Sequence, residues 1–136
     1  MKFLDKLFEF LDRKNKKLIY FLLQSIKDCV EDKFLDNYAI QIDCIKHIQW
    51  VLDVEVDLYM EDDSYCKDRY IKKWEKERKI AEIKLIDINN KIYRLKFYVV
   101  NGHIFSIESN LPFRNLKVKN IVDLEIKCSN ITSLNK

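Results

Sequence analysis

Hydrophobic residues at the start of this chain recur at steps of three and four positions. The residues that follow this period are Leu4, Leu7, Phe8, Leu11, Leu18, Leu22, Ile26, Cys29 and Val30. The period predicts one amphipathic helix of about thirty residues, or two helices broken near residues 12–17. Because the segment holds no glycine or proline, a continuous or merely bent helix is favoured.

The next two segments permit different interpretations. In residues 37–44, Ile40 and Ile42 alternate with Gln41, which favours a strand. Across residues 45–52 the apolar positions are three and four apart and would equally suit a short helix. The pattern leaves both interpretations open.

Residues 51–60, VLDVEVDLYM, alternate between apolar and acidic side chains. The apolar set is Leu52, Val54, Val56 and Leu58, and the acidic set is Asp53, Glu55 and Asp57. Since successive side chains of a strand point to opposite faces, the segment predicts a half-buried strand with an acidic outer face.

Residues 61–79 predict a helix. Acidic side chains and Ser64 begin the segment and basic side chains end it, an order that complements the helix macrodipole. Trp74, together with Tyr70 or Ile71, would make the inward contacts.

Alternation in the second half of the chain predicts three strands and then a last one. The inward residues would be Ala81, Ile83 and Leu85, then Tyr93, Leu95, Phe97 and Val99, then Phe105 and Ile107, and finally Leu116, Val118, Val122, Leu124, Ile126 and Cys128. Tight turns at residues 88–90 and at Gly102 would join the first three as hairpins.

The only glycine and the only proline of the chain, Gly102 and Pro112, lie close together in the sequence. Asn-Gly between apolar runs signals a hairpin turn, and Pro112 marks the exit from the strand that follows. A two-residue turn would set Phe97 opposite Ser106. A three-residue loop is favoured, because it keeps apolar residues opposite one another. Its pairs would be Val99 with His103, Phe97 with Phe105 and Leu95 with Ile107.

These elements predict a single α+β domain over residues 1–136. A long N-terminal helix would pack on an antiparallel, meander-rich sheet of four to six strands. The inner face of the sheet would carry Val54, Val56, Ile83, Leu85, Leu95, Phe97, Phe105 and Ile107. A curved sheet around a helix could also enclose a pocket, as in cystatin-like or cone-shaped folds.

Composition narrows the class of protein further. The 136 residues are 48% hydrophobic and 12% aromatic, which excludes intrinsic disorder as the general state. The four cysteines, Cys29, Cys44, Cys66 and Cys128, form no CxxC pair. No signal peptide is visible, and the longest apolar run is far shorter than the ~20 residues of a membrane span. We therefore expect a cytoplasmic protein with free thiols and no membrane contact.

Six acidic residues and no basic one lie between positions 53 and 63. They are Asp53, Glu55, Asp57, Glu61, Asp62 and Asp63. Carboxylates at alternate strand positions lie about 7 Å apart on one face. Such a face could hold a hard cation, act as a general acid and base, or dock a basic protein surface. Alternatively, it neutralises Lys84, Arg94 and Lys96 across the sheet.

Metal binding, nucleophilic catalysis and a ligand pocket have weaker support in the sequence. Cys44 and His47 supply only two metal ligands, so no metal site or other cofactor is expected. No cysteine lies in a recognisable nucleophile turn, and an enzyme is less expected than a binding protein. His47, Tyr93 and His103 are the polar residues that an alternative ligand pocket would use.

Residues 67–79 form a basic patch interleaved with aromatic side chains. Such a composition can bind nucleic acid. Acidic residues dilute the patch, and the formal net charge of the chain is only +3. A nucleic-acid partner is therefore a secondary alternative.

The phrase VVNGHIFSIESNLP at residues 99–112 resembles the C-terminal hairpin of small bacterial immunity proteins from polymorphic-toxin loci. The resemblance covers about a tenth of the chain and carries over no residue roles. It implies a protein-interaction module that binds and occludes one cognate toxin. The acidic strand would then be the surface that faces the toxin.

Overall fold

The computed structural model describes residues 16–129 of the chain. A helix runs through residues 16–25, and short 3₁₀ turns follow at Lys27–Cys29 and Asp32–Phe34. The remaining helical elements are α2 (Leu35–Asp43), α3 (Ser64–Lys67) and 3₁₀ turns at Lys72–Trp74 and Val118–Asn120. The strands are β1 (Ile45–Val51), β2 (Glu55–Met60), β3 (Arg78–Asp87), β4 (Ile92–Val100), β5 (His103–Ser109) and β6 (Ile121–Cys128).

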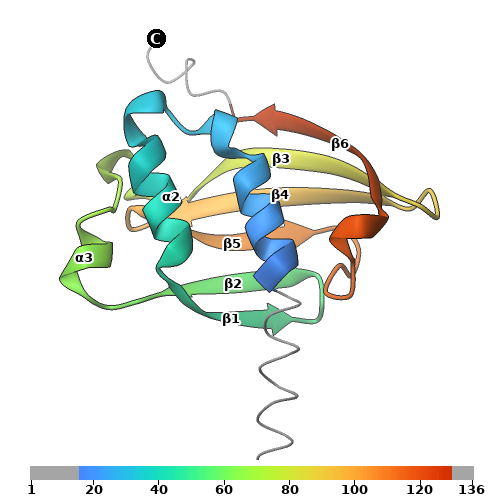
Figure 1. The fold of residues 1–136 in the computed structure, drawn as a ribbon, viewed down its shortest axis with the longest axis horizontal. Coiled ribbons are helices and arrows are strands. Elements are labelled where there is room, and N and C mark those ends of the chain that lie inside the picture. Colours follow the sequence, from blue (N-terminus) through green and yellow to red (C-terminus); the bar gives the residue numbers. More distant parts are fainter. Residues whose placement is uncertain (1–15, 130–136) are drawn as a thin grey trace, which may run out of the picture.

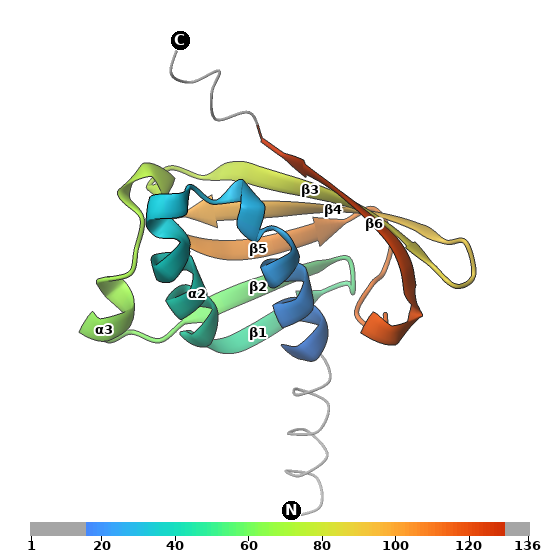
Figure 2. The same cartoon turned by 45° about the horizontal axis from the view of Figure 1, so that its top comes forward.

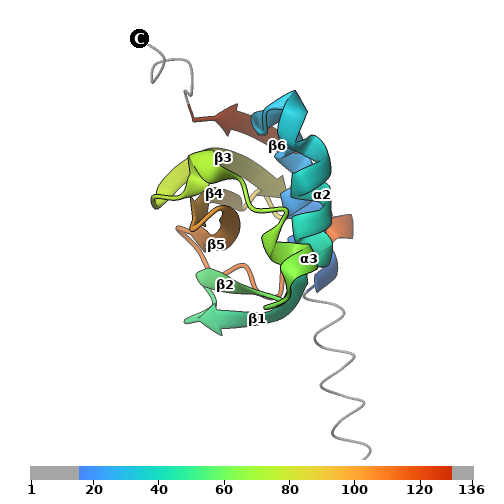
Figure 3. The same cartoon turned by 90° about the vertical axis from the view of Figure 1, so that its left-hand side faces the viewer.

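All six strands form one antiparallel sheet in the order β1-β2-β5-β4-β3-β6. The helix at residues 16–25 and α2 lie across the same face of this sheet, as Figure 1 and the side view in Figure 3 show. Figure 2 shows β6 crossing beside β3, at the opposite edge of the sheet from β1. The other face of the sheet is covered by no element within residues 16–129.

The core lies between these helices and the sheet. Six of the eight inward positions predicted from the sequence are buried: Val56, Ile83, Leu85, Leu95, Phe97 and Ile107. Val54 and Phe105 are only partly buried. The helices contribute Leu18, Ile19, Leu22, Leu23, Tyr38 and Ile42, and Ile26 follows the first helix; all of them are at most 2% exposed. The α+β class and the antiparallel sheet are thus confirmed.

The expected long N-terminal helix is wrong within the described residues, because the helix ends at residue 25. The Ser25 hydroxyl donates to the Phe21 carbonyl at 2.7 Å, a bond that competes with the helical backbone. The chain then turns so that Cys29 can reach β6. The expected part before residue 16 lies outside the described residues. No helix among those described is both long enough and apolar enough to cross a membrane.

The predictions for residues 37–52 are reversed. Residues 37–44 belong mainly to helix α2, and residues 45–51 form strand β1. The alternation places Gln41 on an outward polar face, but the residue is fully buried. On a helix Tyr38, Gln41 and Ile42 share one face, and that face packs into the core.

The single strand predicted over residues 51–60 begins only at Glu55. Val51, Leu52, Asp53 and Val54 form the turn between β1 and β2, closed by the Val54 amide donating to the Val51 carbonyl at 3.2 Å. Leu52 and Asp53 have φ angles of 49° and 59°, and Leu52 is 87% exposed. From Glu55 onward the predicted alternation is confirmed.

The helix predicted over residues 61–79 is wrong except for α3. The Asp63 carboxylate accepts from the Cys66 amide at 2.8 Å and caps this short helix. The chain beyond it bonds to the β4–β5 turn instead of to itself. The Ile71 amide donates to the Gly102 carbonyl at 2.7 Å, and the Gly102 amide donates to the Trp74 carbonyl at 3.0 Å.

The β4–β5 hairpin uses a two-residue turn, so the predicted three-residue loop is wrong. Val100 pairs with His103 across Asn101 and Gly102, whose φ angles are 53° and 92°. A bulge at Phe105 then restores the apolar register. As a result Phe97 lies opposite Ile107, and Lys96 lies opposite Glu108.

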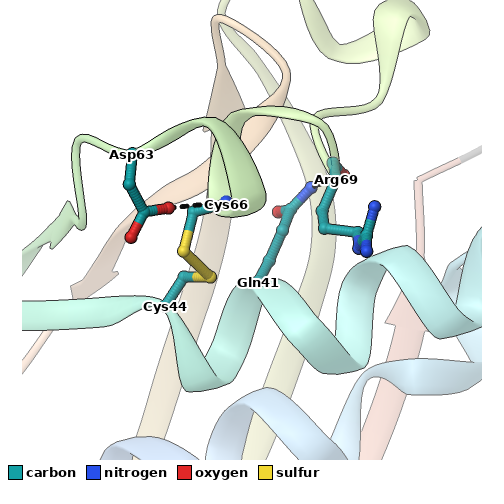
Figure 4. The surroundings of a disulfide bond; sticks show 5 residues. All are labelled: Gln41, Cys44, Asp63, Cys66 and Arg69. Atoms are coloured by element: carbon teal, nitrogen blue, oxygen red, sulfur yellow. Dashed lines mark hydrogen bonds between the residues drawn. A yellow bond between two sulfur atoms is a disulfide. The ribbon is translucent and has the colours of Figure 1, made fainter.

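The expectation of free thiols is wrong, because the four cysteines form two disulfides. Cys29 is bonded to Cys128 with a Cα–Cα distance of 5.1 Å, and Cys44 to Cys66 with 5.9 Å. Figure 4 shows how the second bond joins the end of α2 to the α3 segment. The bonded cysteines are 99 and 22 residues apart in the sequence, so their spacing did not indicate that the fold brings them together.

Candidate functional site

Three carboxylates converge on the uncovered face of the sheet. Glu55 and Asp57 alternate with the buried Val56 on β2 and so point away from the helices. The residue opposite Glu55 on the neighbouring strand β5 is Glu108. We call Glu55, Asp57 and Glu108 the carboxylate cluster. None of the three forms an ion pair with another residue of the described range.

The electrostatics of the carboxylate cluster are unfavourable to the fold. A hydrogen bond with Asp57 raises the pKa of Glu55 from its ordinary value of 4.5 to about 7, and burial and the negative charges of Asp57 and Glu108 add to the rise. Like charges directly opposite one another also destabilise a sheet. An incoming cation would relieve both effects.

Glu108 is the member of the cluster that the sequence did not predict. It meets Glu55 only because β2 pairs with β5, two strands that are far apart in the sequence. No local pattern reports such a pairing, since strand alternation fixes the face of a residue and not its neighbour strand. The alternation did predict correctly that Glu55 and Asp57 share a face.

The other predicted acidic residues lie elsewhere. Asp53 is in the β1–β2 turn, where its carboxylate is 3.6 Å from the Arg114 guanidinium. Glu61 follows the far end of β2, roughly 20 Å from Glu55 by the strand rise. Asp62 pairs with Lys67 at 2.6 Å, and Asp63 caps α3.

The basic residues expected to neutralise the acidic strand have other neighbours. On β4, Lys96 lies between Glu82 and Glu108 in the register of the sheet. Lys84 lies between Arg94 and Glu125. These side chains, with Lys127, line a shallow groove of about 330 Å³ over β3, β4 and β6. None of the three expected partners lies opposite Glu55 or Asp57.

The residues proposed for an alternative pocket do not converge. His47 stacks against Tyr59 on β1 and β2, with ring centroids 5.6 Å apart. His103 stacks against Tyr70 at 4.8 Å. Tyr93 is seven residues before Val100, the partner of His103, which separates the two by roughly 23 Å along the strand.

Metal binding finds no support in the described part of the chain. Cys44, the thiol considered beside His47, is bonded to Cys66 and offers no thiolate. Within residues 16–129 no group of three or more His, Cys, Asp or Glu side chains is arranged to hold a metal ion.

The basic segment 67–79 is poorly arranged for nucleic acid. Three of its lysines form ion pairs, Lys67 with Asp62, Lys73 with Glu31 and Lys79 with Glu82. Trp74 is 4% exposed and packs edge-on against Tyr38, so its ring cannot stack on a base.

No protein-family model, curated protein or solved structure matches this chain.

Proposed function

We propose that this protein is an interaction module that binds one partner protein through the uncovered face of its sheet. The carboxylate cluster receives a lysine or arginine of the partner. The observation that carries the proposal is that Asp57 and Glu108 lie beside Glu55 and that none of the three forms an ion pair with a described residue, although Lys96 is opposite Glu108 in the sheet. The resemblance of residues 99–112 to immunity proteins suggests that the partner is a toxin, blocked by occlusion.

Charge complementarity makes such a partner plausible in physical terms. An arginine guanidinium can bond to two carboxylates at once, and charged groups that match across an interface favour both encounter and specificity. Binding would return the pKa of Glu55 toward its ordinary value, because the cation removes the repulsion that raised it. Occlusion needs no catalytic residue.

The two disulfides bear on where this interaction takes place. Disulfides form and persist in oxidising compartments and are rare in the cytosol. We therefore place the interaction in an oxidising compartment rather than in the cytoplasm expected from the sequence. Alkylation of the native protein followed by mass spectrometry tests this. Cysteines that are protected until reduction support it, and four freely alkylated cysteines contradict it.

The binding proposal is tested by capturing partners from the native source with the tagged full chain. The variant Glu55→Gln with Asp57→Asn removes two charges of the cluster and keeps the side-chain shapes. We expect one stoichiometric protein partner, and we expect the variant to retain about a tenth of it or less.

The matched control is Asp123→Asn with Glu125→Gln. These two residues also alternate on one strand, β6, and both are exposed. The control should capture the partner as the natural chain does. Equal loss in both variants, equal retention in both, or the absence of any protein partner would each contradict the proposal.

A further inference from the structure

A small polar pocket lies at the end of the sheet, beyond the carboxylate cluster. The connection from β5 to β6 must cross two strands, because β4 and β3 lie between them. Along this path the Phe113 amide donates to the Asp53 carbonyl, and the Ile88 amide donates to the Asn120 carbonyl, both at 2.9 Å. The connection, the β1–β2 turn and the β3–β4 turn together border an open pocket of about 320 Å³. That volume is at the lower end of the range for small-ligand pockets, ~300–1,000 Å³.

The floor of this pocket includes a buried carboxylate. Asp87 is 6% exposed, and its Oδ1 accepts from the amides of Asn89 and Lys91, each at 2.9 Å. Its Oδ2 has only the Tyr93 hydroxyl, at 3.4 Å. No basic side chain of the described residues forms an ion pair with it. A buried carboxylate oxygen with one long hydrogen bond is poorly satisfied and would favour a donor that carries positive charge.

The rim of the pocket has the opposite charge. Lys91, Arg114 and Lys117 all line it. Arg114 is already paired with Asp53 at 3.6 Å. The Lys91 ammonium lies 5.6 Å from the centre of the Tyr93 ring, and within residues 16–129 neither Lys91 nor Lys117 is paired with a carboxylate. The two lysines are therefore available to an anionic group.

A negative floor and a positive rim suit a small ligand that carries both charges. We propose that this pocket binds a free amino acid, with its ammonium group on Asp87 Oδ2 and its carboxylate held by Lys91 and Lys117. The polar lining accommodates such a ligand better than an apolar one. None of the three residues of the carboxylate cluster lines the pocket, so the proposal stands apart from partner binding.

The test is an NMR titration of the ¹⁵N-labelled full chain with glycine, L-glutamate and L-arginine in turn. Methylammonium chloride and sodium acetate serve as probes that carry a single charge. We expect at least one amino acid to shift the amides of Asn89, Lys91 and Lys117 saturably, and both single-charge probes to bind about tenfold or more weakly.

Two variants make the assignment specific. Asp87→Asn keeps an oxygen for the two turn amides but removes the charge. Lys117→Glu changes an exposed rim residue whose side chain forms no ion pair within residues 16–129. Each substitution should weaken binding of the amino acid about tenfold or more. Lys84→Glu, on the open face of the sheet, should leave this affinity unchanged. No saturable shift with any amino acid, acetate binding as tightly as the amino acids, or Lys117→Glu binding unchanged would each overturn the proposal.

Discussion

Gly102 is the position at which the fold depends most on a single residue. Its φ angle of +92° is one that residues with a Cβ rarely adopt, and a Cβ built there would lie 2.7 Å from the Cβ of Tyr70. The sequence did predict a turn at this residue, because Asn-Gly between apolar runs signals one. It could not predict the close approach of Tyr70, which comes from a segment about thirty residues earlier that was expected to be helical.

Replacing Gly102 with alanine should therefore destabilise the protein. We expect a loss of about 2–4 kcal/mol in the free energy of unfolding, from backbone strain and the overlap with Tyr70. Urea unfolding measures it. Asn101→Gly in the same turn, at an exposed residue with φ of 53°, should change stability by less than about 0.5 kcal/mol. Equal effects of the two substitutions would contradict the account of the turn.

Glu55 should make stability depend on pH. Its folded-state pKa of about 7 lies above its ordinary value of 4.5, so the folded state binds the proton more tightly than the unfolded state. Its contribution to stability is thus fully present below about pH 4.5 and is lost as the pH rises to about 7. Glu55→Gln should raise the melting temperature by about 2–4 °C near pH 8 and leave it unchanged near pH 4.

The control for this prediction is Glu125→Gln on the same face of the sheet. Glu125 lies opposite Lys84 and loses a favourable neighbour on substitution. It should not raise the melting temperature near pH 8. Stabilisation by Glu125→Gln as large as that by Glu55→Gln would mean that the face simply carries too much negative charge.

At the scale of elements, helix α2 shows why the sequence pattern predicted a strand where the structure has a helix. A buried glutamine breaks the apolar period that identifies a helix, and here Gln41 is buried because it joins three segments. Its amide nitrogen donates to the carbonyls of Arg69 at 2.8 Å and Gly102 at 3.1 Å, and its oxygen accepts from the Ile104 amide at 3.4 Å. Figure 4 shows the side chain reaching from α2 to Arg69. These partners are remote in sequence, so no local pattern could reveal them.

Removing the amide of Gln41 should loosen the whole 67–75 segment. Gln41→Leu keeps the volume but removes three hydrogen bonds, those to the Arg69 and Gly102 carbonyls and the one from the Ile104 amide. We expect a loss of about 2–4 kcal/mol in the free energy of unfolding. Hydrogen exchange at the Ile71 and Gly102 amides should accelerate. The control Asn37→Leu removes only a 3.4 Å bond to the same Arg69 carbonyl and should cost less than about 1 kcal/mol. Protection unchanged in Gln41→Leu would contradict this role.

The meander of β3, β4 and β5 was the part best predicted from sequence. Its strands alternate cleanly, as in Ile83 and Leu85 or Leu95 and Phe97, because one face is buried and the other open. Their hairpin connections are short and local. The β2–β5 and β3–β6 pairings involve long connections, and the cluster at Glu55 and Glu108 depends on the first of them.

At the scale of the whole molecule, the two disulfides tie the helical layer to distant parts of the chain. The Cys29–Cys128 bond spans 99 residues and fixes the edge strand β6, while the Cys44–Cys66 bond spans 22. Closing such loops restricts the unfolded chain. Sequence spacing alone could not assign these bonds, since four cysteines allow three pairings.

Removing the Cys29–Cys128 bond with the double substitution to serine should lower the free energy of unfolding by about 3–5 kcal/mol. Urea unfolding under oxidising conditions measures the loss. Adding a reductant should destabilise the natural chain by more than it destabilises the double variant, because the natural chain has two bonds to lose. Stability that does not respond to reductant in either protein would contradict the presence of the disulfides.

The most direct test of the central claim is an NMR pH titration of the side-chain carboxyl groups of the full chain. We predict that Glu55 titrates near pH 7 and that Asp57→Asn returns its pKa toward 4.5, because Asp57 is the largest cause of the shift. A bound cationic partner should also lower the pKa of Glu55. If Glu55 of the free protein titrates near 4.5, the carboxylates do not repel one another, and the proposed binding site loses its physical basis.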